Sequence, residues 1–183
     1  DMKGKKPSCD EANLIKVALH LAGGSLTIQP DTQGKIVWAI EGVLAYSERP
    51  GFPLAAVPTR TVDRWLSQVQ QLGIRSVINM LSEEEMAVYY RHLGVPLLQY
   101  YADTGLEVRE VAHEDQGGIV PMDVLLDRVK AAFGYLPRPV IIHCSAGAER
   151  SKLAVDMLRR EWKSRCRKPP RGRRPQKPFR GSS

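Results

Sequence analysis

The chain has 183 residues, of which 43% are hydrophobic and 26% are charged. This is the length of about one average domain with ordinary globular composition, which excludes collagen-like, disulfide-scaffold and fully disordered proteins. The longest run without a charged residue, residues 17–30, includes glycine, serine and histidine. It is shorter and more polar than the roughly 20 apolar residues that a membrane-spanning helix needs.

The net charge of +7 is concentrated at one end of the chain. Residues 163–183 contain nine of the 27 Lys and Arg residues and no acidic residue, which leaves 18 basic and 20 acidic residues in residues 1–162. The body of the protein is therefore nearly neutral, and the charge does not predict a nucleic-acid binder as a whole. Residues 164–183, rich in Pro, Arg and Gly, predict a disordered basic tail that contacts RNA or acidic surfaces.

The first part of the chain gives one helical and two extended patterns. Residues 1–9 are polar and predict a flexible N-terminus. Apolar residues at helical spacing predict a helix over residues 10–22. Extended segments are expected at residues 25–29 and 35–46, on either side of a turn, and the loop at 50–58 is marked by Pro and Gly.

Helical and extended patterns alternate through the rest of the chain. Ser82 and Glu85 have the spacing of a capping box, which predicts the start of a helix. In chain order the predicted elements are a helix at 61–72, a strand at 74–81, a helix at 82–94, a strand at 95–101, a long polar loop at 102–120, a helix at 122–133, a strand at 139–143 and a helix at 151–163.

This alternation is typical of βαβ units. The continuously apolar strand at 140–142 fits a sheet covered on both faces. We therefore expect a single α/β domain over residues 10–163, with a mostly parallel central sheet flanked by helices on both faces.

The strongest chemical pattern surrounds Cys144. This thiol leaves an apolar strand, precedes a loop that contains Gly147, and is followed by Arg150 where a helix begins. Such a strand–loop–helix turn points several backbone N–H groups and the positive end of a helix dipole into one concavity. An oxyanion fits there, and the planar guanidinium of Arg150 can bind two of its oxygens.

The same positive field favours the thiolate form of Cys144, which makes it a candidate nucleophile. Ser151 is placed to donate a hydrogen bond to the sulfur and so to stabilise it as a leaving group. An inert, structural cysteine is the alternative, because the Cys–Arg spacing alone is a weak signal. The expected phosphate-binding residues are Ser145, Ala146, Gly147, Ala148, Glu149 and Arg150.

The segment from His143 to Ser151 resembles the signature loop of cysteine-dependent protein tyrosine phosphatases, especially the dual-specificity branch. Residues 40–47, the helix with Trp65 and residues 73–80 match the order of that family's opening strand, first helix and next strand. The resemblance covers residues 36–163. It implies a phosphatase-like catalytic domain and a two-step hydrolysis of phosphomonoesters through a phosphocysteine, without a metal or cofactor.

The resemblance also implies a general acid, an Asp on a mobile loop that precedes the helix leading to the cysteine strand. Asp115 is the expected acid, and the glycines at 117–118 would let its loop close over substrate. Asp103, nearer the predicted strand end, is the competing candidate. The same loop contains two further candidates, His113 and Glu114.

The sequence thus predicts a phosphatase that acts on phosphotyrosine, phosphoserine or phosphothreonine in proteins, or on small phosphate esters. An RNA 5′-triphosphatase, a catalytically weak phosphate-binding module and a rhodanese-type sulfurtransferase are the alternatives. The histidines lack the paired spacing of metal ligands, so no metal site is expected. Cys9, Cys144 and Cys166 are odd in number and widely spaced, which favours a reducing, cytoplasmic compartment over a disulfide framework. Cys9 and Cys166 are expected to be ordinary thiols.

Overall fold

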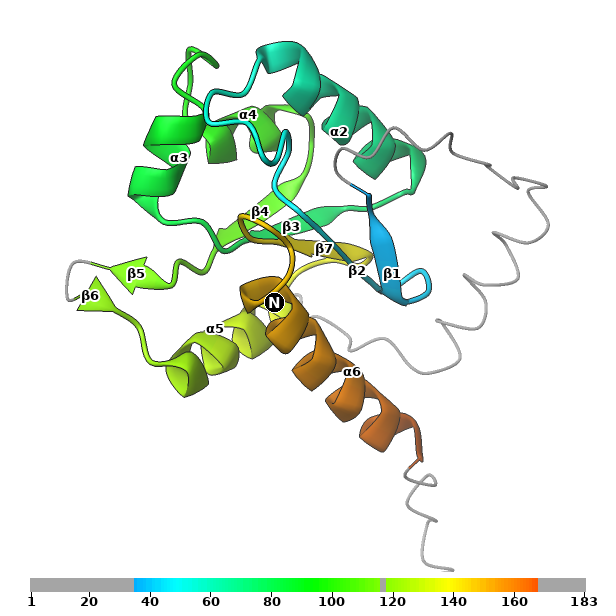
Figure 1. Ribbon diagram of the computed structural model, residues 1–183. Coiled ribbons are helices and arrows are strands. Elements are labelled where there is room, and N and C mark those ends of the chain that lie inside the picture. Colours follow the sequence, from blue (N-terminus) through cyan, green and yellow to red (C-terminus); the bar gives the residue numbers. More distant parts are fainter. Residues whose placement is uncertain (1–34, 116–117, 168–183) are drawn as a thin grey trace, which may run out of the picture.

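A computed structural model describes residues 35–115 and 118–167 of the chain. The predicted helix at 10–22 and the extended segment at 25–29 lie outside these residues, as does all but the beginning of the basic tail. The described residues form the predicted α/β domain, with helices on both faces of one main sheet (Figure 1).

The main sheet has five strands in the order β1-β2-β7-β3-β4. β1 pairs with β2 in antiparallel fashion, whereas the other neighbours are parallel. The predicted mostly parallel sheet is therefore confirmed. Its strands are β1 (Val37–Ile40), β2 (Leu44–Ser47), β3 (Ser76–Asn79), β4 (Glu107–Glu110) and β7 (Val140–His143).

Two layers of helices cover this sheet, as Figure 1 shows. One layer packs around Trp65 and the β7 residue Ile141. The other packs around Leu125 and the β7 residues Val140 and Ile142, so the apolar run of β7 is buried on both faces as predicted. The first layer contains α2 (Thr59–Gln71), α3 (Glu83–Tyr89) and α4 (Leu97–Asp103), and the second contains α5 (Met122–Tyr135) and α6 (Arg150–Arg167).

The predicted strand at 95–101 is wrong, because this segment forms α4. Leu97 and Tyr101 are buried one helical turn apart, and Pro96 precedes the first residue of the helix. A short apolar run fits a buried helix as well as a buried strand. The actual strand, β4, begins at Glu107, twelve residues after the predicted start. It lies at the edge of the sheet, and its polar sequence Glu-Val-Arg-Glu lacks the apolar pattern that would have predicted it.

The predicted long loop at 102–120 is more ordered than expected. It contains β4 and a small hairpin of β5 (Glu114–Asp115) and β6 (Gly118–Ile119). α3 also ends at Tyr89, before its predicted end at Gly94, and α6 continues to Arg167 rather than to Lys163.

Four strand ends form one row at the carboxyl edge of the parallel strands. Ser47 of β2 and Asn79 of β3 are both in register with His143 of β7, and Glu110 of β4 is in register with Asn79. The segments that follow these four residues therefore emerge at the same edge. In open α/β sheets this edge is where ligands bind.

Candidate active site

Cys144 lies directly after β7 at this edge and begins the Cys144 loop (residues 144–149), which leads into α6. Its side chain is buried and its thiol is free. Ser151, in the first turn of α6, is also buried, and its Oγ lies 3.2 Å from the Cys144 Sγ. The structure therefore brings together the predicted nucleophile and the predicted donor to its sulfur.

The Cys144 loop is held against the segment that follows β2. The backbone N–H of Arg49 donates to the Ser145 carbonyl at 3.0 Å. Gly147 has φ +69°, and a Cβ at this position would lie 2.9 Å from the Glu48 backbone nitrogen. Glycine is thus required in the loop both by its conformation and by the close approach of another backbone segment.

The loop leaves its own amides available to a ligand. Within the described residues, no backbone–backbone hydrogen bond takes the N–H of any residue from 145 to 149. The side chains of Ala146, Ala148 and Glu149 are exposed, whereas Ser145 and Gly147 are half-buried. Successive N–H groups without a backbone partner, next to a helix N-terminus, are a suitable site for an oxyanion.

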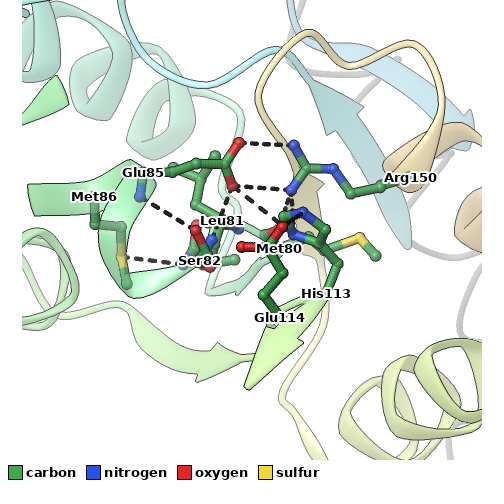
Figure 2. A network of polar contacts seen from close by, with 9 residues as sticks. Met80, Leu81, Ser82, Glu85, Met86, His113, Glu114 and Arg150 are labelled. Carbon is green, nitrogen blue, oxygen red and sulfur yellow. Dashed lines mark hydrogen bonds and ion pairs between the residues drawn. The ribbon is translucent and has the colours of Figure 1, made fainter. Parts of the chain in front are cut away.

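Arg150 closes the loop, and its guanidinium is fixed by several acceptors (Figure 2). Nη2 donates to Glu85 Oε1 at 2.8 Å, and Nη1 lies 3.0 Å from Glu85 Oε2 and 2.8 Å from the Met80 carbonyl. Both side chains of the pair are about four-fifths buried. Burial opposes the charged form of Glu85, but the hydrogen bonds from Arg150 and from the Ser82 backbone outweigh it, so the pKa of Glu85 is lowered.

The capping box predicted at Ser82 is present and positions this carboxylate. The Ser82 N–H donates to Glu85 Oε2 at 2.9 Å, and the Glu85 N–H donates to Ser82 Oγ at 3.2 Å. Sequence reasoning found the capping box but missed Glu85 as a site residue. The available signal was that this box directly follows the β3 segment, and so emerges at the same sheet edge as Cys144.

The segment after β4 brings His113 to the site. Its Nδ1 lies 2.7 Å from Nη1 of Arg150, and its Nε2 lies 3.1 Å from Glu114 Oε1. A guanidinium can only donate, so Nδ1 accepts this hydrogen bond and the proton of the neutral ring is on Nε2, facing Glu114. The structure thus places two of the candidate acids, His113 and Glu114, beside the Arg150 guanidinium.

The two aspartates proposed as the acid lie at different edges of the sheet. Asp115 is in β5, five residues beyond the end of β4 at the carboxyl edge, and its backbone pairs with Gly118. Asp103 ends α4 and accepts a hydrogen bond from Gln99 at 2.6 Å. It precedes β4, whose first residue, Glu107, is in register with Ser76, the first residue of β3. Asp103 therefore lies at the opposite edge from Cys144, and the structure does not bring it to the loop.

His143 is buried behind Cys144 in a neutral polar cluster. Its Nε2 lies 3.2 Å from the Tyr101 hydroxyl, and the Trp65 ring packs against both side chains. Burial lowers the pKa of His143 to about 4. His143 is therefore a buried hydrogen-bonding residue rather than a base.

Other sequence predictions can be checked against the described residues. Cys166, near the end of α6, is disulfide-bonded, so the prediction of an ordinary thiol there is wrong. Among the described residues there is no group of three or more His, Cys, Asp or Glu residues that could hold a metal ion. None of the described helices is long and apolar enough to cross a membrane.

Comparison with solved structures identifies the fold. A structure of kinase-associated phosphatase with its catalytic-site cysteine substituted by serine has a TM-score of 0.53 and 19% sequence identity, covering 72% of this chain and 75% of that one. The chain has the protein tyrosine phosphatase-like fold. The predicted fold class and the fold implied by the resemblance are thereby confirmed.

Two further matches are more distant. The core catalytic domain of the PP-IP phosphatase Siw14 from S. cerevisiae is 16% identical with a TM-score of 0.44, covering 74% of this chain and 70% of that one. TpbA from P. aeruginosa, in complex with pTyr, is 17% identical with a TM-score of 0.38, covering 72% and 70%. No protein-family model and no curated protein matches the chain.

Proposed function

We propose that the protein is a cysteine-dependent phosphatase that hydrolyses phosphomonoesters at Cys144. One observation carries this proposal: a buried free thiol lies next to Ser151 and is followed by a loop that leads to Arg150, and within the described residues the N–H groups of this loop have no backbone partner. A structural thiol needs neither the unbonded amides nor a fixed guanidinium beside it.

The first step transfers the phosphoryl group to the protein. The Cys144 thiolate attacks phosphorus, the S–P bond forms, and the bond from phosphorus to the ester oxygen breaks. The loop amides and Arg150 bind the phosphoryl oxygens. The leaving oxygen takes a proton from a general acid, for which we propose Asp115, because an unprotonated alkoxide leaves poorly.

The second step releases phosphate and restores the thiolate. Water attacks the phosphocysteine while Asp115, now ionised, takes its proton. The S–P bond breaks, and its electron pair returns to the sulfur. A hydrogen bond from the Ser151 hydroxyl, 3.2 Å away, stabilises the departing thiolate.

We propose phosphorylated proteins or small phosphate esters as substrates, because the Cys144 loop contains Glu149 and no Lys or Arg before Arg150.

Turnover of p-nitrophenyl phosphate in the presence of a chelator tests the reaction. We expect wild-type protein to be active and Cys144→Ser to retain less than about 1% of its activity, because serine is not ionised at neutral pH. In Ser151→Ala the second step should be the slower one, so p-nitrophenol should appear in a burst equal to the enzyme concentration. A protein that binds phosphate but turns over no ester would be a binding module. Selective hydrolysis of triphosphate-ended RNA would support the RNA 5′-triphosphatase instead.

A further inference from the structure

Arg49, two residues after β2, has an unusual environment for a cationic side chain. It is only 2% exposed, although arginine is almost never fully buried without a charged partner. Its guanidinium carbon lies 3.7 Å from the centroid of the Tyr89 ring and 5.7 Å from that of Phe52. These rings contribute cation–π attraction but carry no net charge.

Within the described residues, no ion pair joins a carboxylate to this guanidinium. Nη2 donates to the Leu54 carbonyl at 2.7 Å, and within the described residues Nε and Nη1 have no hydrogen-bond partner. The nearby Tyr90 is no counter-ion either: burial raises its pKa, even though the charge of Arg49 and a hydrogen bond with the Arg49 side chain lower it, so the phenol is neutral and donates to the Pro50 carbonyl. A buried cation without a counter-charge is costly, so its presence calls for an explanation.

The segment that carries Arg49 forms the support of the Cys144 loop. The Arg49 N–H binds the Ser145 carbonyl, and the backbone of residues 47–48 fills the space where Gly147 has no Cβ. The charge of Arg49 also acts on His143, the residue that precedes Cys144. After burial, the positive charges of Arg49 and Arg150 both help to lower the pKa of His143, and the contribution of Arg49 is the larger of the two.

The charge balance of the site gives this cation a role. Arg150 is already paired with Glu85 by two hydrogen bonds, so the pair contributes little net charge, and Glu149 adds a negative charge to the loop. The proposed reaction nevertheless places a thiolate and a phosphate dianion at Cys144. We propose that Arg49 is an electrostatic positioning residue of this site, a buried and permanent positive charge that holds anions at the Cys144 loop from behind. This proposal rests on the proposed function only for the identity of the anion.

The field at Cys144 can be measured without turnover by alkylation of the thiol. Iodoacetate is an anion and iodoacetamide is neutral, while both transfer a carbon to the thiolate with loss of iodide. The ratio of their rates, followed at Cys144 by mass spectrometry, therefore reports the local field. In Arg49→Gln this ratio should fall about tenfold, because one unit charge near the site is removed. Arg60→Gln, which removes an exposed charge on α2, is the matched control and should leave the ratio unchanged.

Two measurements keep the proposal testable if Arg49→Gln folds poorly. Arg49→Lys retains the charge and should retain the wild-type ratio; a tenfold fall in this variant would overturn the proposal. In the wild type, the ratio of the two alkylation rates at about 0.5 M salt should be similar to the ratio at low salt, since a buried charge is screened far less than surface charges. A large fall of this ratio at high salt would show that surface charges produce the field, and it would overturn the proposal.

Binding of inorganic phosphate to the Cys144→Ser variant gives the second line of evidence. Adding Arg49→Gln to this background should weaken binding about tenfold, and adding Arg60→Gln should not. Equal affinities in the two double variants would refute the role of Arg49. Because neither assay requires catalysis, a protein without phosphatase activity would refute the proposed function while leaving this inference to be decided by the alkylation ratio.

Discussion

The guanidinium of Arg150 and the carboxylate of Glu85 face each other through two hydrogen bonds of 2.8 and 3.0 Å, although the residues are 65 positions apart in the chain. Arg150 begins α6, whereas Glu85 is in the first turn of α3. The pair links the two helical layers across the carboxyl edge of the sheet, and it sets the direction in which Arg150 presents its remaining N–H groups.

Glu85→Gln should impair catalysis more than stability. Glutamine still fits the capping box but cannot hold Arg150 as a charged, two-point partner. Misplacement of a substrate-binding group by about 1 Å can cost about 10²-fold, and we expect a loss of this size in kcat/KM for p-nitrophenyl phosphate. Ser82→Ala is the control: it removes the cap, at a cost of about 1 kcal/mol in unfolding free energy. It leaves the Arg150–Glu85 pair intact, so unchanged kcat/KM is expected. Equal activity losses in both variants would mean that α3 as a whole, rather than the Glu85 charge, matters.

Gly147→Ala should disable the Cys144 loop. Its positive φ strains any residue with a Cβ by about 1 kcal/mol, and the new methyl group would lie 2.9 Å from the Glu48 nitrogen. Since backbone cannot move aside cheaply, the loop should shift and activity should fall about 10²-fold. Gly134→Ala, in α5 with no heavy atom within 4 Å of the added Cβ, should keep full activity and raise the unfolding free energy by up to about 1 kcal/mol. An active Gly147→Ala enzyme would show that the loop has another conformation.

Asp115→Asn tests the general acid by its dependence on the leaving group. With a phenyl or alkyl phosphate, the variant should lose about 10²- to 10⁴-fold in kcat. The loss should shrink with p-nitrophenyl phosphate, because that leaving group needs less help from a proton. Asp103→Asn is a matched control at the opposite edge of the sheet, and its kinetics should stay at the wild-type level. If Asp115→Asn has no effect while His113→Gln or Glu114→Gln reproduces this pattern, the acid is one of the two residues beside Arg150.

Unfolding free energy should fall as the pH decreases from 6.5 to 4, in part because of His143. In the folded state its pKa is about 4, so it stays neutral over this range, whereas in the unfolded chain it takes up a proton below about pH 6.5. The unfolded state therefore gains protons first, and the loss reaches about 3 kcal/mol near pH 4. Denaturant titrations of His143→Gln should show a flatter profile over this range. The profile of His92→Gln, which changes an exposed histidine, should match the wild type.

Local chemistry allowed much of this domain to be predicted from its sequence. The capping box at Ser82 depends on residues three positions apart, and the Cys144 loop lies within one continuous segment. The apolar run of β7 likewise requires burial on both sides wherever it packs. Patterns of this kind specify their structure through neighbours in the chain, so the α/β class and the Cys144–Ser151 pair could be predicted before the fold was known.

Where local patterns were ambiguous, tertiary packing decided the outcome. The apolar pattern of residues 95–101 is compatible with a strand and with a helix. The segment forms α4 because Leu97 and Tyr101 pack on one side of the sheet. β4 is polar because an edge strand needs few apolar contacts, so its hydrogen bonds to β3 identify it where its sequence does not.

The sequence by itself determined the composition of the Cys144 loop, since the proposed nucleophile, the loop amides and Arg150 are adjacent in the chain. Only the tertiary structure decided what surrounds it: Glu85, His113 and Arg49 come from three other segments, and the direction of β4 places Asp103 at the opposite edge of the sheet. The physical reason is the register of the parallel strands. Strands β2, β7, β3 and β4 end in one row, and this row gathers residues that no spacing along the chain relates to one another.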